Sequence, residues 1–252
     1  SMIWPARSVN PPEPAVRLQL VETPMADQRK RAATARTPRA GDGSPWAVRH
    51  RRPRDHDLKR DAVVRAAAQE FNARGYHNTS LDDIAFALGV TKPTVYYYVA
   101  NKEQLLFECF REGLQRIREV IIATERSDRP ARERLDTVVR GYAAAVASEY
   151  GWCMVRAHEH DLGQDLGRQI NVLKSERDQG IRRLLREGVA DGSIGPCDPK
   201  IAAFAMAGAL NWIAHWYREN QPLTAAEVGD AFVAFFDNGL LPRPARTMPT
   251  GA

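Results

Sequence analysis

Several residue patterns are scarce or missing in this chain of 252 residues, and each absence excludes a class of protein. No stretch of 18 consecutive apolar residues occurs, so we predict no membrane-spanning helix. Only three cysteines are present, Cys109, Cys153 and Cys197, and they are far apart with no Cys-x-x-Cys spacing. This pattern predicts free thiols in a reducing, cytoplasmic compartment rather than a disulfide framework or a zinc site.

Motifs that mark enzymes are missing as well. The sequence has no nucleophile elbow, no glycine-rich phosphate-binding loop and no constellation of paired carboxylates. The run from His158 to Asp161 invites interpretation as a metal site. On a helix, however, His158 and His160 point about 200° apart and cannot share one ion. We therefore predict no enzymatic activity, no cofactor and no metal.

Positive charge is concentrated at the N-terminal end of the chain. The net charge is +5, but residues 1–55 alone contain 11 Lys and Arg against 5 Asp and Glu. This segment is rich in Pro, Arg, Ala and Gly and has no periodicity, so we expect a disordered basic extension. It would act either as a basic arm that adds affinity for phosphates or as an inert extension. A flexible tail is expected at residues 242–252.

Helical periodicity and capping patterns predict an all-α fold for residues 56–241. No segment alternates apolar and polar residues in the manner of a strand. Capping patterns precede several of the segments with helical periodicity. Helices are expected at residues 58–74, 81–88, 92–98, 131–149, 151–161, 164–190, 199–219 and 225–239, with a long helix from the capping pattern at 101–104 to about 125.

Residues 81–95 have the spacing of a helix-turn-helix unit. Counted from Leu81, the fifth position is the small Ala85, the ninth is Gly89 and the fifteenth is the apolar Val95. A small residue lets the second helix cross closely, glycine tolerates a left-handed turn, and the apolar residue locks the helices together. The same spacing also occurs in helical bundles that bind no nucleic acid.

The second helix of this unit is expected to present polar and aromatic side chains. Short polar groups near a helix N-terminus can reach base edges, and tyrosine hydroxyls can donate to phosphate oxygens. We expect Tyr96 to pack partly inward and Lys102 to contact a phosphate. The side chains expected to face outward are those of Thr91, Lys92, Thr94, Tyr97 and Tyr98.

The stretch TSLDDIAFALGVTKPTVYYYVANKEQLL resembles the N-terminal signature of the TetR family of bacterial transcription regulators. The resemblance covers about residues 58–110. Val99 stands where the family usually has phenylalanine. Residues that match the family pattern are Gly89, Val90, Pro93, Thr94, Val95, Tyr96, Tyr98 and Lys102.

This resemblance implies a fold, a partner and roles for single residues. It implies a homodimer with two DNA-binding units, each a three-helix helix-turn-helix domain, and a helical-bundle domain for ligand binding and dimerisation. It adds Ser80 as a phosphate contact and places Pro93 among the DNA-binding candidates. It assigns phosphates to Tyr96, Tyr98 and Lys102, and the bases to Thr91, Lys92, Thr94 and Tyr97.

Two C-terminal segments carry the side chains of a candidate dimer interface. Residues 199–220 are apolar on more than one side and contain small residues that permit close helix packing. Paired with their copies, these segments would form a four-helix interface, and the alternative is that they are core helices of a monomer. The candidate interface residues are Ile201, Ala205, Gly208, Ala209, Phe232, Phe235 and Phe236.

Aromatic and polar residues of the C-terminal part are candidates for a ligand pocket, although ordinary core packing also explains them. The segments AGALNWIAHWYREN and FFDNGL are similar to TetR regulators of lipid, fatty-acid and sterol catabolism, which implies an acyl-CoA ligand. The candidate ligand-binding residues are Tyr142, Trp152, Met154, His158, Asn211, Trp212, His215 and Trp216.

The sequence thus predicts a ligand-responsive repressor that binds a palindromic operator as a dimer. A small apolar or acyl-CoA-type effector would release it. The expected domains are residues 56–103 for DNA binding and residues 104–241 for ligand binding and dimerisation, with no membrane partner. Two alternatives remain, namely a DNA-binding protein without an effector and a helical lipid or acyl carrier with a vestigial DNA-binding unit.

Overall fold

The structure is a computed structural model that describes residues 53–157, 159–218 and 220–240, and all of the described secondary structure is helical. The predicted all-α fold is confirmed. Residues 1–52 of the expected extension and the tail at 242–252 lie outside the described residues. The elements are α1 (Pro53–Arg74), α2 (Leu81–Leu88), α3 (Lys92–Tyr96), α4 (Lys102–Glu125), α5 (Ala131–Ala147), α6 (Gly151–Val155), the 3-10 turn η2 (Glu159–Asp161), α7 (Gln164–Ala190), α8 (Pro199–Asn211), α9 (Ile213–Trp216) and α10 (Ala225–Leu240).

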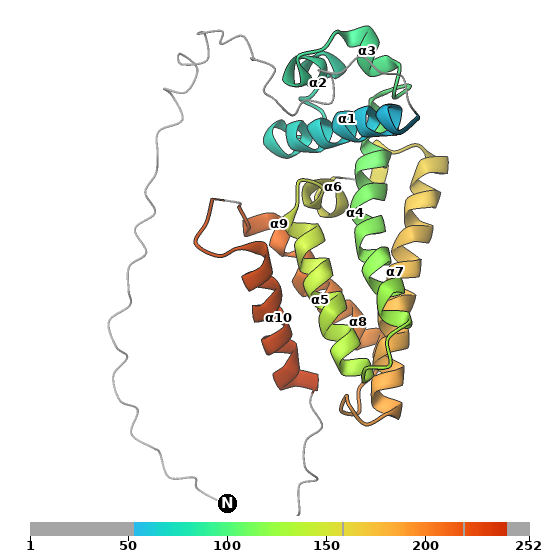
Figure 1. Ribbon diagram of the computed structural model, residues 1–252, viewed down its shortest axis with the longest axis vertical. Helices are drawn as coiled ribbons and strands as arrows, with labels where there is room; N and C mark the ends of the chain where they lie inside the picture. The colour runs from blue at the N-terminus through green and yellow to red at the C-terminus, as the bar shows by residue number, and fades with distance from the viewer. Residues whose placement is uncertain (1–52, 158, 219, 241–252) are drawn as a thin grey trace, which may run out of the picture. The chain divides into compact units, whose positions relative to one another are not determined.

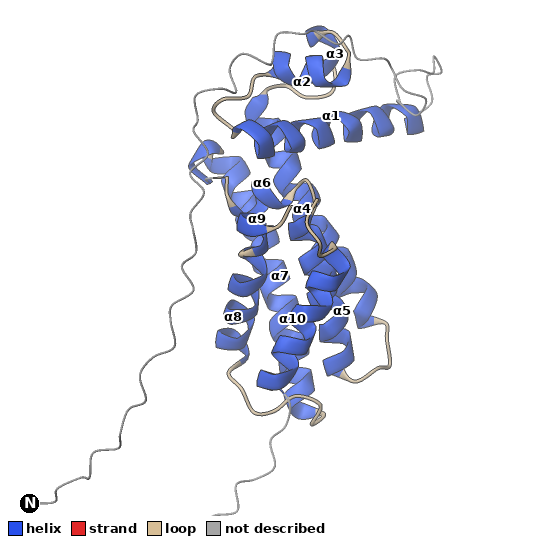
Figure 2. Cartoon of the chain, turned by 90° about the vertical axis from the view of Figure 1, so that its left-hand side faces the viewer, coloured by secondary structure: helices blue, strands red, loops and turns tan. Residues whose placement is uncertain are grey.

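Helices α1 to α3 form a unit that we call the head, and α4 to α10 form a bundle that we call the body. Helix α1 lies across the end of the body, and α4 runs from the head between α5 and α7 (Figure 1). The turned view shows α2 and α3 on the side of α1 that faces away from the body (Figure 2). The expected stripe Val63, Ala67 and Phe71 is fully buried and forms the core of the head.

Some predicted helix boundaries are wrong. The first helix begins at Pro53, inside the segment expected to be disordered, because proline suits the first position of a helix. The expected helix 151–161 ends at Val155, since the N–H groups of Arg156 and Ala157 both donate to the carbonyl of Trp152. Helices also end early at Tyr96 and Ala147.

The expected helix at 199–219 is interrupted and ends early. Helix α8 stops at Asn211, and α9 is a single turn that ends at Trp216. Tyr217 leaves the helix with an extended backbone, at φ −67° and ψ 139°. Apolar periodicity alone does not reveal this break, because the apolar residues continue through it.

Side-chain caps define the helix starts as predicted. Ser80 and Asp83 form a complete capping box at α2, and Thr224 and Glu227 form one at α10. Asp198 accepts from two backbone N–H groups at α8. At α4, Asn101 accepts from the N–H of Gln104 at 2.7 Å, but Gln104 accepts from Ala100 rather than from Asn101.

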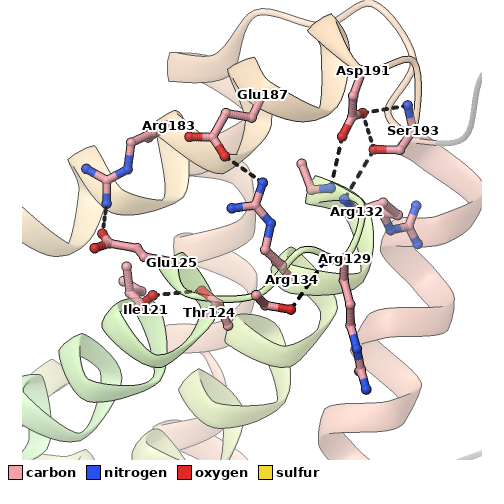
Figure 3. A network of polar contacts seen from close by, with 12 residues as sticks. Ile121, Thr124, Glu125, Arg129, Arg132, Arg134, Arg183, Glu187, Asp191 and Ser193 are labelled. Carbon is pink, nitrogen blue, oxygen red and sulfur yellow. Dashed lines mark hydrogen bonds and ion pairs between the residues drawn. The ribbon is translucent and has the colours of Figure 1, made fainter.

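Polar contacts hold the end of the body that lies away from the head. The Asp191 carboxylate accepts from the N–H of Ala131 at 3.0 Å, and Arg134 donates to Glu187 at 2.6 Å. Figure 3 shows how these contacts join the start of α5 to the end of α7. Within the described residues, none of the helices combines the length and apolar content that crossing a bilayer requires.

Candidate functional site

The helix-turn-helix geometry follows from residues whose spacing predicted it. Gly89 has φ 66° and ψ 30°, a left-handed conformation that side chains with a Cβ rarely adopt. The N–H of Val90 donates to the carbonyl of Ala85 at 3.0 Å and closes the turn. Ala85 is 4% exposed and Val95 is fully buried, so both contact residues lie between the helices. The predicted roles of these residues are confirmed.

Helix α3 presents a polar surface to solvent. Thr91, Lys92 and Pro93 are exposed, and Tyr97 directly after the helix is 67% exposed. The hydroxyl oxygens of Thr91 and Thr94 lie 2.9 Å apart and share a hydrogen bond. Because Val95 fixes the opposite face of α3 in the core, this surface keeps one orientation relative to the head.

The three consecutive tyrosines differ in their exposure. Tyr96 is 48% exposed, whereas Tyr98 packs against the core and lies with its ring 5.1 Å from that of His56. The prediction that Tyr96 packs partly inward agrees with this exposure, and the DNA contact of the half-buried Tyr98 stays a prediction. Tyr98 follows Val95 by three residues, which returns it to the buried side of the turn.

A depression of about 490 Å³ lies between the N-terminal ends of α2 and α4, where exposed N–H groups favour phosphate. Ser80 lies at its edge, and its hydroxyl donates to Asp83 at 2.6 Å. Hydrogen bonds from Ser80, followed by the charge of Arg74, hold the pKa of Asp83 below its usual value. The depression thus combines two helix N-termini with a carboxylate that stays charged.

Lys92 is the basic residue of α3, and it already has a partner within the head. Its ammonium lies 2.7 Å from a carboxylate oxygen of Asp82, a hydrogen bond that raises the pKa of Lys92. Both side chains are exposed, so a DNA phosphate can compete for the ammonium. We did not predict the role of Asp82, although an acidic residue in the first turn of α2 is visible in the sequence.

Replacing Lys92 with glutamine is expected to lower the salt dependence of DNA binding, because one fewer counterion is released. The slope of log K against log salt should fall in magnitude by about 1. Fluorescence anisotropy on a DNA duplex at several salt concentrations measures this slope. Arg186→Gln is the control, since Arg186 is exposed on α7, away from the head. An equal slope for wild type and Lys92→Gln contradicts a role for Lys92 at the phosphates.

Lys102 has two hydrogen-bond partners within the protein, and its contact with a phosphate stays a prediction. Its ammonium donates to the carbonyls of Tyr76 at 2.9 Å and Thr79 at 3.0 Å, and it lies 4.3 Å from the centre of the Tyr76 ring. Two of its three N–H groups are therefore used inside the protein. Lys102 joins the first turn of α4 to the loop between α1 and α2, and so it positions the head.

The predicted ligand-binding residues do not form one pocket. Tyr142 and Met154 are buried in the body, and the Tyr142 hydroxyl donates to Asn211 at 2.9 Å. Burial raises the pKa of Tyr142 to about 12, so the phenol stays neutral. Trp152 is half-buried and lines a separate cleft at the head.

The other predicted ligand-binding residues lie at the surface. Trp212 is 63% exposed and stacks on His215 with 4.4 Å between the ring centres. Trp216 is 36% exposed, and His158 lies outside the described residues. The structure does not bring Trp212, His215 and Trp216 together with the buried Tyr142 and Met154.

The candidate dimer residues line an apolar surface on α8 and α10. Ile201 is 63% exposed and Phe235 is 69% exposed. Between the two helices lies an apolar groove of about 560 Å³. Phe204, 48% exposed, belongs to the same surface and was missed, although it follows Ile201 by three residues. The groove is lined by Gly208, Ala209, Trp212, Ala231, Phe232 and Phe235.

A further cleft, between the head and the body, was not predicted from the sequence. A cleft of about 580 Å³ lies between α1 of the head and the α5–α6 and α9 regions of the body. Three arginines line it, Arg65, Arg156 and Arg218. They come from segments far apart in the sequence, so no local pattern joins them. Among the described residues, no group of three His, Cys, Asp or Glu side chains could hold a metal ion.

Two family descriptions match the chain along its length. Residues 63–109 match "Bacterial regulatory proteins, tetR family". Residues 128–240 match "Tetracyclin repressor-like, C-terminal domain". Together these ranges cover the helix-turn-helix and most of the body.

Curated relatives are named as transcriptional regulators. The chain is 30% identical over 166 residues to the HTH-type transcriptional repressor ComR of Escherichia coli, covering 62% of this chain and 77% of that protein. It is 25% identical over 189 residues to the HTH-type transcriptional repressor KstR2 of Mycolicibacterium smegmatis, covering 72% and 90%.

Solved structures share the fold, and the family follows from the matches together. A crystal structure of AibR in complex with isovaleryl coenzyme A and operator DNA has 28% identity and a TM-score of 0.61, covering 70% of this chain and 97% of that one. The ketosteroid transcriptional regulator KstR2 of Mycobacterium tuberculosis has a TM-score of 0.66, with 22% identity and coverage of 73% and 96%, and shows the fold alone. The chain belongs to the TetR family of bacterial transcription regulators.

Proposed function

We propose that this protein is a ligand-responsive transcriptional repressor that binds a palindromic operator as a homodimer. An effector of the acyl-CoA type releases it from DNA. The observation that carries the proposal is the exposed face of α3, with Thr91, Lys92 and Tyr97, held by buried Val95. Short polar and basic groups on a helix of this kind are suited to reading a major groove.

The apolar surface on α8 and α10 supports the homodimer. One helix-turn-helix reads a half-site, so a palindromic operator needs two. Phe235 and Ile201 leave a large apolar area in contact with water, which a second copy of the chain would cover. We assign DNA binding to the head, and effector binding and dimerisation to the body; the expected boundary between residues 103 and 104 falls within the first turn of α4.

Several features support an effector with the chemistry of a thioester. AibR, 28% identical to this chain, is described in one complex with isovaleryl coenzyme A and operator DNA. In the body, the buried Tyr142 donates a hydrogen bond to the half-buried Asn211 beside apolar core. Successive major grooves on one face of DNA are about 34–36 Å apart. An effector releases DNA only if it binds more tightly to a conformation of the dimer in which the spacing of the two heads no longer matches this distance.

The relatives are named as regulators, and we propose that this protein regulates transcription and has no enzymatic activity. Its site of action is the bacterial cytoplasm, where the operator is found. A DNA-binding protein without an effector and a helical lipid carrier with a vestigial head are the two other functions that the same fold can serve.

The test selects bound fragments of bacterial genomic DNA and then titrates isovaleryl-CoA and longer acyl-CoAs into the complex. We expect a two-fold symmetric site whose half-sites lie about one helical turn apart, and release at micromolar to millimolar thioester. Fluorescence anisotropy measures both steps, and coenzyme A without an acyl chain is the control. Symmetric binding without release contradicts the effector, and the lack of any preferred site contradicts the repressor.

A further inference from the structure

The cleft between α1 and the body is lined by more positive than negative side chains. Arg65, Arg156 and Arg218 line it, and Glu149 is its acidic residue. Glu149 lies 3.3 Å from Arg65 and 3.8 Å from Arg116, so its charge is already balanced. Among the described residues that line the cleft, no further carboxylate balances the charges of Arg156 and Arg218.

Both of these arginines can donate to a ligand. Arg156 is exposed, and within the described part of the chain its guanidinium has no ion pair or hydrogen bond. Arg218 is also exposed and donates one N–H to the carbonyl of Tyr217 at 2.6 Å. Its remaining N–H groups can donate elsewhere. The planar fork of a guanidinium matches two oxygens of a phosphate group.

Part of the lining of the same cleft is apolar. Val146 and Ile213 are buried beneath it, and the half-buried rings of Trp152 and Tyr217 form part of its wall. Such a combination favours a ligand with an anionic end and an apolar or planar part. A simple anion gains less from the cleft, because water solvates it better than apolar side chains do. The volume of about 580 Å³ is that of a small-molecule site.

We propose that this cleft binds an amphipathic organic phosphate, with Arg156 and Arg218 holding the phosphate and Trp152 contacting the apolar part. The proposal rests on the proposed function in one respect, namely that the ligand is an effector. Binding in the cleft itself is independent of DNA release.

The position of the cleft gives the ligand a direct effect on the head. Its walls belong to α1 of the head and to α6 and α9 of the body. Helix α9 directly follows Trp212, which lines the apolar groove on α8 and α10. A ligand that contacts both walls binds best at one separation of head and body. It therefore stabilises one orientation of the head directly. No conformational change has to be transmitted through the interior of the body.

Isothermal titration of the DNA-free full-length protein tests the site. The probes are coenzyme A, isovaleryl-CoA and inorganic pyrophosphate. We expect both coenzyme A compounds to bind, and Arg156→Gln and Arg218→Gln each to weaken this binding by about tenfold, as the loss of a charge-assisted hydrogen bond implies. Arg186→Gln is the matched control and should bind like wild type, because Arg186 is exposed on α7 and does not line the cleft.

Three results overturn the proposal. The first is that wild type binds neither coenzyme A compound. The second is that the double variant Arg156→Gln and Arg218→Gln binds both as wild type does. The third is that pyrophosphate binds as tightly as coenzyme A, which makes the cleft a plain anion site. Operator release is measured separately, so thioester binding that depends on the two arginines but does not release DNA contradicts the effector role and supports the cleft.

Discussion

Phe235→Glu is expected to convert the dimer into monomers and to weaken operator binding by at least about 100-fold. Phe235 is 69% exposed on α10 and lines the apolar groove with Trp212 and Phe232. In a two-fold symmetric interface each substitution occurs twice, and each buries a carboxylate without a partner. Sedimentation velocity measures the mass, and fluorescence anisotropy on the selected operator measures the affinity.

Val172→Glu is the control for this substitution. Val172 is an apolar residue of similar exposure, 57%, but it lies on α7, outside the groove. The same loss of an exposed apolar group there should change neither the mass of the dimer nor its affinity for the operator. A Phe235→Glu protein that stays dimeric would place the interface on another surface of the body.

Glu108→Ala is expected to lower the free energy of unfolding by about 1.5–3 kcal/mol, because it removes the charged hydrogen-bond partner of two partly exposed arginines. Glu108 is 5% exposed on α4. One carboxylate oxygen lies 2.6 Å from Arg60 of α1, and the other lies 2.5 Å from Arg111 of α4. Urea denaturation followed by far-UV circular dichroism measures the change.

Glu112→Ala is the matched comparison for Glu108→Ala. Glu112 lies one turn later on the same helix and pairs with Arg116 at 3.3 Å, but both side chains are more than a third exposed. An exposed pair of this kind contributes less than about 1 kcal/mol. Equal losses of unfolding free energy in the two variants would show that the pair of Glu108 with Arg60 stabilises the fold no more than an exposed ion pair does.

The head could be predicted from the sequence because its determinants are local. Val63, Ala67 and Phe71 repeat at helical spacing, and Gly89 stands where the turn needs a left-handed residue. Tyr98 follows Val95 by three residues, and this spacing agrees with its half-buried position against the core.

The body was less predictable because its contacts join distant segments. The two carbonyls that hold Lys102 belong to residues more than 20 positions earlier, and no pattern in the sequence marks them. Trp212 lies in a continuous apolar stretch, so the break that turns it to the surface is set by packing. The grouping of Arg156 with Arg218 likewise exists only once the chain has folded.

The continuity of α4 has a mechanical consequence. The helix has 24 residues and no proline, and it is therefore about 36 Å long. Its first turn is fastened to the head by Lys102, and its last residue, Glu125, forms an ion pair with Arg183 of α7. A tilt of roughly 5° about that far end displaces the other end by roughly 3 Å, a leverage set by helix length alone. A small rotation about the far end of the body thus becomes a displacement of about 3 Å at the end of α4 that joins the head.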